Sequence, residues 1–292
     1  MKRKKFDVTK TQMHPVFIVS LAILILYAAI MFFLIGWGAL KSVQTADDFI
    51  LSGNSYAALP SNITLNNYVD AFSMIEANGT YLFGMFGNSI LYSAGCAAVA
   101  IFIPCLVGYL TAKINVWFNK VVIGLVYFSM FFTCYGAMPS MIQTMNDLRL
   151  MDTWIGIYLM KASFLSNTCL IFHATFKSLS KEYSEAALID GASHVKIMFG
   201  ICFPLVKTTI LVLFVTSFIT FWNDYQTPMI YLESFPTASY GLFLFNDARN
   251  SYNDMLVYKT AGFMLILLPT FLIFILLKDY LLGNLTEGGV KG

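Results

Sequence analysis

Charged residues are scarce in this sequence. Asp, Glu, Lys and Arg make up 12% of its 292 residues, whereas hydrophobic residues make up 58%. Soluble domains have roughly twice that share of charged residues, so the balance predicts an integral membrane protein. The formal net charge of +2 is too small to indicate a nucleic-acid partner.

Motifs of several enzyme and transporter classes are also missing. The sequence has no GxxxxGKS/T phosphate-binding loop, so we expect ATP to be hydrolysed elsewhere. It has no HExxH, no GxSxG and no paired membrane aspartates, which disfavours an intramembrane enzyme. Internal repeats and multiple ion-coupling charges, typical of secondary transporters, are not found either. None of the five cysteines has metal-ligand spacing, so we expect no metal site.

Long hydrophobic runs are what the sequence does contain. Six of them reach the roughly 20 residues that a spanning helix needs, which predicts an all-α integral membrane protein with six transmembrane helices. We expect spans at about 16–40, 90–110, 121–143, 154–176, 205–231 and 255–277. The transmembrane domain would cover 15–282, between an N-terminal segment, 1–14, and a tail, 283–292. The first run is longer than a signal-peptide core and lacks an obvious cleavage site, so we expect it to be retained.

The distribution of basic residues predicts the orientation. With the N-terminus inside, 13 Lys and Arg residues fall in inner segments and 5 in outer segments, out of 18 in all. Cytoplasmic loops have an excess of Lys and Arg. Both termini are therefore expected in the cytoplasm, together with the polar segment 180–204 between the fourth and fifth spans. The longest outer segment, 42–87, has no function that its pattern predicts.

The segment 180–204 has polar residues at helix-capping positions. Ser180 can cap a short helix that begins at Lys181, and Gly191 stands where a helix end needs a left-handed residue. Ser193 can cap a second helix that begins at His194. The pattern predicts a projecting helix–turn–helix elbow that docks on a partner, although an amphipathic linker on the lipid surface fits it equally well. In the docking elbow, short side chains at 186 and 187 would let a partner approach the backbone closely.

This segment resembles the EAA loop of ABC importer permeases. The resemblance rests on Glu185-Ala186-Ala187, on the DGAS stretch 190–193 and on Pro204. The chain is similar in particular to the smaller permease subunit of binding-protein-dependent sugar importers of the maltose type. Further matching stretches are Asn88-Ser89, Pro139, Leu150–Thr153, Phe221–Asp224, Pro228 and the tail from Gly283.

The resemblance implies a transport mechanism. The chain would pass a di- or oligosaccharide from an extracytoplasmic binding protein to the cytoplasm by alternating access, in a bacterial-type cytoplasmic membrane. Its expected partners are a second homologous permease and two ABC ATPases, which would use ATP and Mg²⁺, while this chain binds no cofactor. The residues implied in ATPase coupling are Glu185, Ala186, Ala187, Asp190, Gly191 and Ala192. A permease for peptides or polyamines, or a self-contained secondary transporter, is the alternative.

Polar residues inside the spans are candidates for the sugar pathway. Thr216, Thr220 and Asn223 are spaced i, i+4, i+7 and so share one face of a helix. The remaining candidates are Asp224, Gln143 and Tyr135. Each has an ordinary structural alternative, because Ser and Thr bond their own helix and Asn and Gln join helices. We further expect Lys161 to extend outward to the interface and His173 to join two helices.

Overall fold

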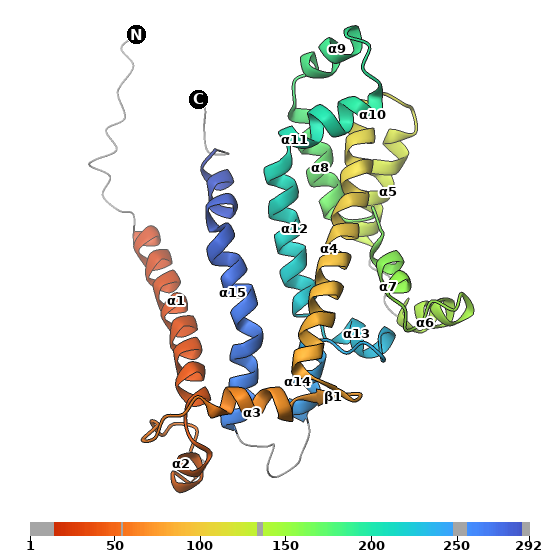
Figure 1. Ribbon diagram of the computed structural model, residues 1–292. Helices are drawn as coiled ribbons and strands as arrows, with labels where there is room; N and C mark the ends of the chain where they lie inside the picture. Colours follow the sequence, from red (N-terminus) through yellow and green to blue (C-terminus); the bar gives the residue numbers. More distant parts are fainter. Residues whose placement is uncertain (1–14, 54, 133–136, 248–255, 288–292) are drawn as a thin grey trace, which may run out of the picture. The chain divides into compact units, whose positions relative to one another are not determined.

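The computed structural model describes residues 15–53, 55–132, 137–247 and 256–287, most of them helical (Figure 1). The chain divides into two compact units. The first comprises residues 1–71 and 250–264, and the second comprises 72–249 and 265–292. The boundaries between them fall within α3 (Asn66–Met74) and α15 (Leu256–Glu287).

The first unit contains α1 (Pro15–Ser42) and α2 (Ala46–Leu51). α1 corresponds to the first predicted span, and its apolar stretch is entirely unburied. Thr45 begins α2, because its hydroxyl accepts a hydrogen bond from the Asp48 amide at 3.3 Å. An apolar helix of this length with no covered face needs lipid or another protein around it.

A buried lysine organises the segment after α1. Lys41 is 1% exposed, and its Nζ donates to Gln44 Oε1 at 2.8 Å and to the Ala58 carbonyl at 2.6 Å. The Gln44 amide in turn donates to Asp48 Oδ2 at 2.9 Å, and the Ser61 amide donates to the same oxygen at 2.9 Å. These hydrogen bonds hold the pKa of Asp48 below its usual range. The segment after α1 therefore has a polar core of its own.

The second unit is built around α4 (Leu82–Lys113). A short antiparallel hairpin, in which β1 (Glu76–Ala77) and β2 (Thr80–Tyr81) each have two residues, precedes α4. The elements that follow are α5 (Asn119–Phe131), α6 (Ala137–Asp147), α7 (Trp154–Lys161), α8 (Asn167–Ser178), α9 (Glu182–Ile189), α10 (His194–Ile197), a π-helical segment (Met198–Cys202), α11 (Phe203–Leu205), α12 (Lys207–Trp222), α13 (Gln226–Tyr231), α14 (Ala238–Asp247) and the rest of α15.

α4 packs lengthwise against α8 and α12 (Figure 1). Gly108 permits the approach to α8, because a Cβ there would lie 2.6 Å from the Phe172 Cβ. Next to this contact, Tyr109 packs edge-to-face on Phe176, with ring centroids 5.5 Å apart. Phe176 also stacks on Phe203 at 5.8 Å, which joins these helices to the start of the α11–α12 region.

The predicted spans differ in continuity. In the described part of the chain, α1, α4 and α15 are each long and apolar enough to cross a membrane alone, and the bent pair 194–205 and 207–222 gives a fourth candidate. The run 121–143 instead contains α5 and α6, and 154–176 contains α7 and α8. The run 205–231 is divided between α12 and α13. Hydropathy located these apolar runs without locating the breaks within them.

Candidate functional site

The elbow begins one residue later than predicted, since α9 starts at Glu182 and its N-cap position is Lys181, which makes no side-chain cap hydrogen bond. The Ser180 hydroxyl lies before this position and accepts a hydrogen bond from the Glu182 amide at 3.2 Å. Glu182 and Glu185 lie in the first turn, where the free amides of the helix favour negative charge. In Figure 1, α9 lies at the end of the second unit, beyond α10.

Gly191 ends α9 as predicted. Its φ is +79°, which side chains with a Cβ rarely adopt. The Gly191 amide donates to the Leu188 carbonyl at 3.0 Å, and the Ala192 amide donates to the Ala187 carbonyl at 2.9 Å. These two bonds form a Schellman motif, in which the left-handed residue lets the chain reverse while the last carbonyls remain bonded. A glycine at 191 is what makes the elbow turn.

The second arm of the elbow is also capped as predicted. The Ser193 hydroxyl accepts a hydrogen bond from the Lys196 amide at 3.3 Å, and α10 follows. The expected helix to residue 201 is α-helical only to Ile197 and continues as the π-helical segment. After α11, the chain bends by 74° at Val206 and enters α12. The elbow is therefore joined directly to a long apolar helix.

The inner side of the elbow packs into the core of the second unit. Ala187 is 8% exposed and lies in the same buried cluster as Tyr109, Phe172, Phe176 and Ile197. This corrects one expectation, since the short Ala187 side chain lies against its own chain and is not offered to a partner. Ala187 thereby joins α9 to the buried cluster that also holds side chains of α4, α8 and α10.

The other side of the elbow is not covered by any part of the chain that the structure describes. Glu185, Ala186, Asp190 and Gly191 are exposed, and Ala192 is half-buried. Sequence reasoning missed the apolar part of this face, where Ile189 is 86% exposed and Leu188 44%. The apolar character of positions 188 and 189, opposite the buried Ala187, was the available signal. A small apolar surface with acidic neighbours, held by a hydrogen-bonded turn, is suited to docking.

The polar stripe of α12 lies on one exposed face. The Thr216 and Thr220 hydroxyls donate to the carbonyls of Val212 and Thr216, at 2.8 and 2.9 Å. The Asn223 amide donates to the Ile219 carbonyl at 2.8 Å. All three side chains are exposed in this chain. Bonding to its own helix lets each of them lie in an apolar environment while one acceptor oxygen stays available.

Asp224 lies at the break between α12 and α13 and contacts three elements. Its Oδ2 accepts a hydrogen bond from the Tyr92 hydroxyl of α4 at 2.8 Å and lies 3.9 Å from Lys161 Nζ of α7. Its Oδ1 accepts a hydrogen bond from the Thr227 amide at 3.0 Å. Lys161 also lies over the Phe221 ring, 5.2 Å from its centroid. Lys161 thus turns toward Asp224 and not outward, which corrects the expectation for this lysine.

The other candidates lie apart from this cluster. Gln143 is exposed on α6, and Tyr135 lies outside the described residues. His173 joins two helices, as expected, since its Nδ1 lies 3.0 Å from the Thr111 hydroxyl of α4. Among the residues that the structure describes, no three His, Cys, Asp or Glu side chains gather as a metal site requires.

The chain is similar to permease proteins of sugar transport systems. The chain is 27% identical over 240 residues to the melibiose/raffinose/stachyose import permease protein MelC of Bacillus subtilis, covering 80% of this chain and 83% of that protein. It is 27% identical over 256 residues to the arabinooligosaccharides transport system permease protein AraQ of Halalkalibacterium halodurans, and the match covers 87% of this chain and 88% of that protein.

The fold also has a solved counterpart. A chain from the crystal structure of a bacterial ABC transporter, involved in the import of the acidic polysaccharide alginate, superposes with a TM-score of 0.76 at 21% identity. The match covers 90% of this chain and 95% of that chain. In addition, the family model for the binding-protein-dependent transport system inner membrane component matches residues 100–286, which contain the elbow and the α12 stripe. The chain belongs to the family of inner membrane components of binding-protein-dependent transport systems.

Proposed function

We propose that this chain is the permease subunit of an ATP-driven importer for a di- or oligosaccharide. The observation that supports it most is the elbow, in which Ala187 is buried in a cluster shared with α4 and α8 while Glu185 and Ala186 beside it are exposed. Such a device transmits force between a docked partner and the membrane helices. The partner would be a cytoplasmic ABC ATPase that contacts Glu185, Ala186, Asp190 and Gly191, with Ala187 and Ala192 bracing the turn from within.

The proposed architecture has six spans, with both termini cytoplasmic. α1, α4 and α15 would each be one span. The fourth span would consist of α7 and α8, which at 1.5 Å per residue give about 12 and 18 Å, together about the 30 Å of a bilayer core. The third would similarly involve α5, and the fifth α12. Interrupted helices occur in transporters where the free backbone groups line a protein-covered cavity.

The proposed substrate class follows from the relatives. The names of MelC and AraQ specify melibiose, raffinose, stachyose and arabinooligosaccharides for those proteins. By analogy this chain passes a carbohydrate delivered by an extracytoplasmic binding protein, in preference to a peptide or polyamine. The exposed oxygens of Thr216, Thr220 and Asn223 provide hydroxyl-binding groups along one helix face, as a sugar pathway requires.

The proposed transport cycle uses the breaks at the two ends of α12, at Val206 and at Asp224. A second homologous permease would face this one, and closure of two ATPases with ATP and Mg²⁺ would move both elbows inward. The motion would pass through Ala187 and the 74° bend at Val206 to α12, which bears the polar stripe. The cluster around Asp224, at the other end of α12, would open and close the outer side.

Purification tests this proposal. The tagged chain is extracted from its native membrane in a mild detergent, and co-purifying proteins are identified by mass spectrometry. We expect an ABC ATPase, a second permease and a sugar-binding protein, whose trapped ligand names the substrate. Recovery of the chain alone, or with copies of itself only, would refute the proposal and favour a self-contained transporter.

A further inference from the structure

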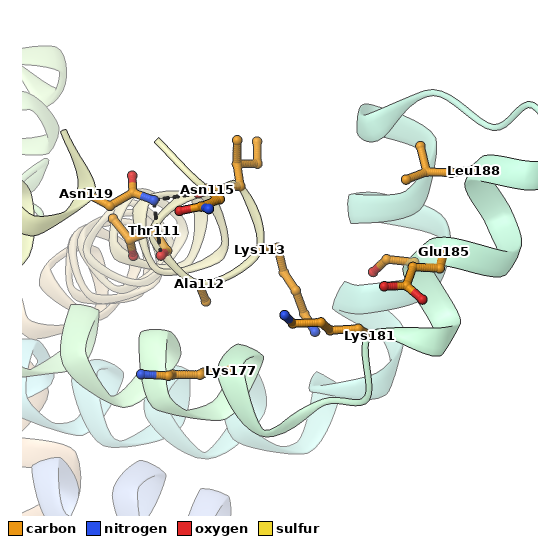
Figure 2. A pocket seen from close by; sticks show the side chains of 11 residues that line it. Thr111, Ala112, Lys113, Asn115, Asn119, Lys177, Lys181, Glu185 and Leu188 are labelled. Carbon is orange, nitrogen blue, oxygen red and sulfur yellow. Dashed lines mark hydrogen bonds between the residues drawn. The ribbon is translucent and has the colours of Figure 1, made fainter. Parts of the chain in front are cut away.

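A basic cavity lies beside the elbow in the second unit. It has a volume of about 520 Å³ and lies between the end of α4, the end of α8 and the start of α9 (Figure 2). Three lysines from these separate segments line it, Lys113, Lys177 and Lys181. Glu185 is the one acidic residue in the lining.

The positive charge of this cavity has little compensation from the chain itself. Lys113 donates one hydrogen bond, to the Leu179 carbonyl at 2.8 Å. Two of the three ammonium protons of Lys113 remain to donate to a ligand. Lys177 and Lys181 form no ion pair with any residue in the described part of the chain. In Figure 2 the Lys113 and Lys181 side chains extend toward one another. Like charges that line one cavity repel each other, and a bound anion would offset this repulsion.

The lining also offers an unused hydroxyl. Ser184 Oγ is buried and has no hydrogen-bond partner among the described residues, although Ser184 lines the cavity. The Asn119 amide, by contrast, is bonded to the carbonyls of Ile114 and Thr111, which fixes the loop at the cavity rim. Lysine ammonium groups with a hydroxyl suit a phosphate group, since its oxygens accept several charge-assisted bonds.

An apolar groove adjoins the basic cavity. Its volume is about 420 Å³, and it shares Thr111, Ile114 and Asn119 with the cavity. The rest of its lining is apolar: Val107, Leu110, Val116, Phe118, Val122 and Phe164. Next to it, Trp117 is 81% exposed, and exposed aromatic rings of this kind mark the headgroup level of a membrane.

We propose that the cavity and groove together bind one anionic phospholipid, with its phosphate headgroup among the three lysines and an acyl chain along the groove. Charge selects the headgroup, and the shared rim makes the two parts continuous. The cytoplasmic leaflet, where anionic lipids attract basic groups, is the side on which this segment lies if the proposed function holds. A lipid bound here would bridge Lys181 of the elbow to α4 and couple the position of α9 to membrane composition.

Lipid binding to the purified full chain in detergent tests the proposal by native mass spectrometry. The probes are dioleoyl phosphatidylglycerol, dioleoyl phosphatidylcholine and inorganic phosphate. We expect the anionic lipid to bind roughly tenfold more tightly than the zwitterionic one. Since a lysine near anionic lipid contributes about a fivefold factor, Lys113→Gln with Lys181→Gln should weaken it by roughly 30-fold. Lys177→Gln, which disturbs no internal bond, should weaken it about fivefold.

The matched control is Lys196→Gln, on α10 and outside the cavity, which should leave binding unchanged. Equal binding of both lipids, or full binding by the double variant, would overturn the proposal. Inorganic phosphate that displaces the lipid at similar concentration would overturn it in favour of a soluble phosphate ligand. Because the chain is tested without an ATPase, loss of lipid selectivity is separable from failure of the proposed function, which the purification detects.

Discussion

Replacement of Gly191 should uncouple the elbow without unfolding the protein. The Cβ of alanine would meet no atom within 4 Å, so crowding is not the problem. The cost arises from φ, which at +79° is a left-handed conformation that costs an L-residue about 1–2 kcal/mol. This corresponds to a factor of about 5–30 in the population of the correctly turned elbow. We expect Gly191→Ala to reduce transport by up to that factor.

Gly191→Pro should have a larger effect. Proline fixes φ near −65° and has no amide proton, so it can neither adopt the turn nor donate to the Leu188 carbonyl. We expect no measurable transport, with the protein still present in the membrane. The matched control is Gly200→Ala, in the π-helical segment, where a Cβ also meets nothing within 4 Å and φ is not left-handed.

The assay is uptake of the sugar identified in the partner binding protein, together with ATP hydrolysis in proteoliposomes. Membrane content is measured by immunoblot, so that reduced expression is not mistaken for uncoupling. The expected order of uptake is Gly200→Ala, then Gly191→Ala, then Gly191→Pro. Normal uptake by both Gly191 variants would refute the role of this turn in coupling.

Three further predictions concern the rest of the chain. A double-mutant cycle of Lys161→Met and Asp224→Asn, measured by unfolding in mixed micelles, should give a coupling energy of about 1 kcal/mol, and additive effects would contradict the ion pair. Gly108→Ala should destabilise the protein by about 1–3 kcal/mol in the same assay, because its Cβ would clash with α8, whereas Gly124→Ala, with open space, should not. The lowered pKa of Asp48 stabilises the segment 42–65 at pH values above the unfolded pKa of about 4, and this contribution is lost as pH falls through the folded pKa. Protection factors for hydrogen exchange over 42–65, corrected for the intrinsic exchange rate at each pH, should therefore fall below pH 4, and Asp48→Asn should lower them similarly at pH 6.

The elbow was predictable because its signals are local. Gly191 and Ser193 act through backbone groups within three residues, so the sequence order alone places these two caps. The helices α1, α4 and α15, each long and apolar enough to cross a membrane, were predictable for a related reason, since the apolar length of a single helix can be counted.

Long-range contacts were not predictable in this way. Lys161 and Asp224 are separated by 63 positions, and the fold brings them together only through the packing of α7 on the α12–α13 break. The burial of Lys41 depends on carbonyls 14 and 17 residues away, so a lysine at a helix end resembled an ordinary interfacial residue. The breaks within the third, fourth and fifth runs escaped detection because hydropathy measures apolar length and not backbone continuity.

The most direct test of the account is cross-linking at two adjacent elbow positions. Cysteine is introduced by Ala186→Cys or by Ala187→Cys in a Cys134→Ser background, since Cys96, Cys105, Cys169 and Cys202 are buried. Native membranes are treated with a short bismaleimide, and cross-linked proteins are identified by mass spectrometry. The account predicts an ABC ATPase linked to the exposed position 186 and not to the buried position 187. No ATPase at position 186, or equal linkage at both positions, would contradict it.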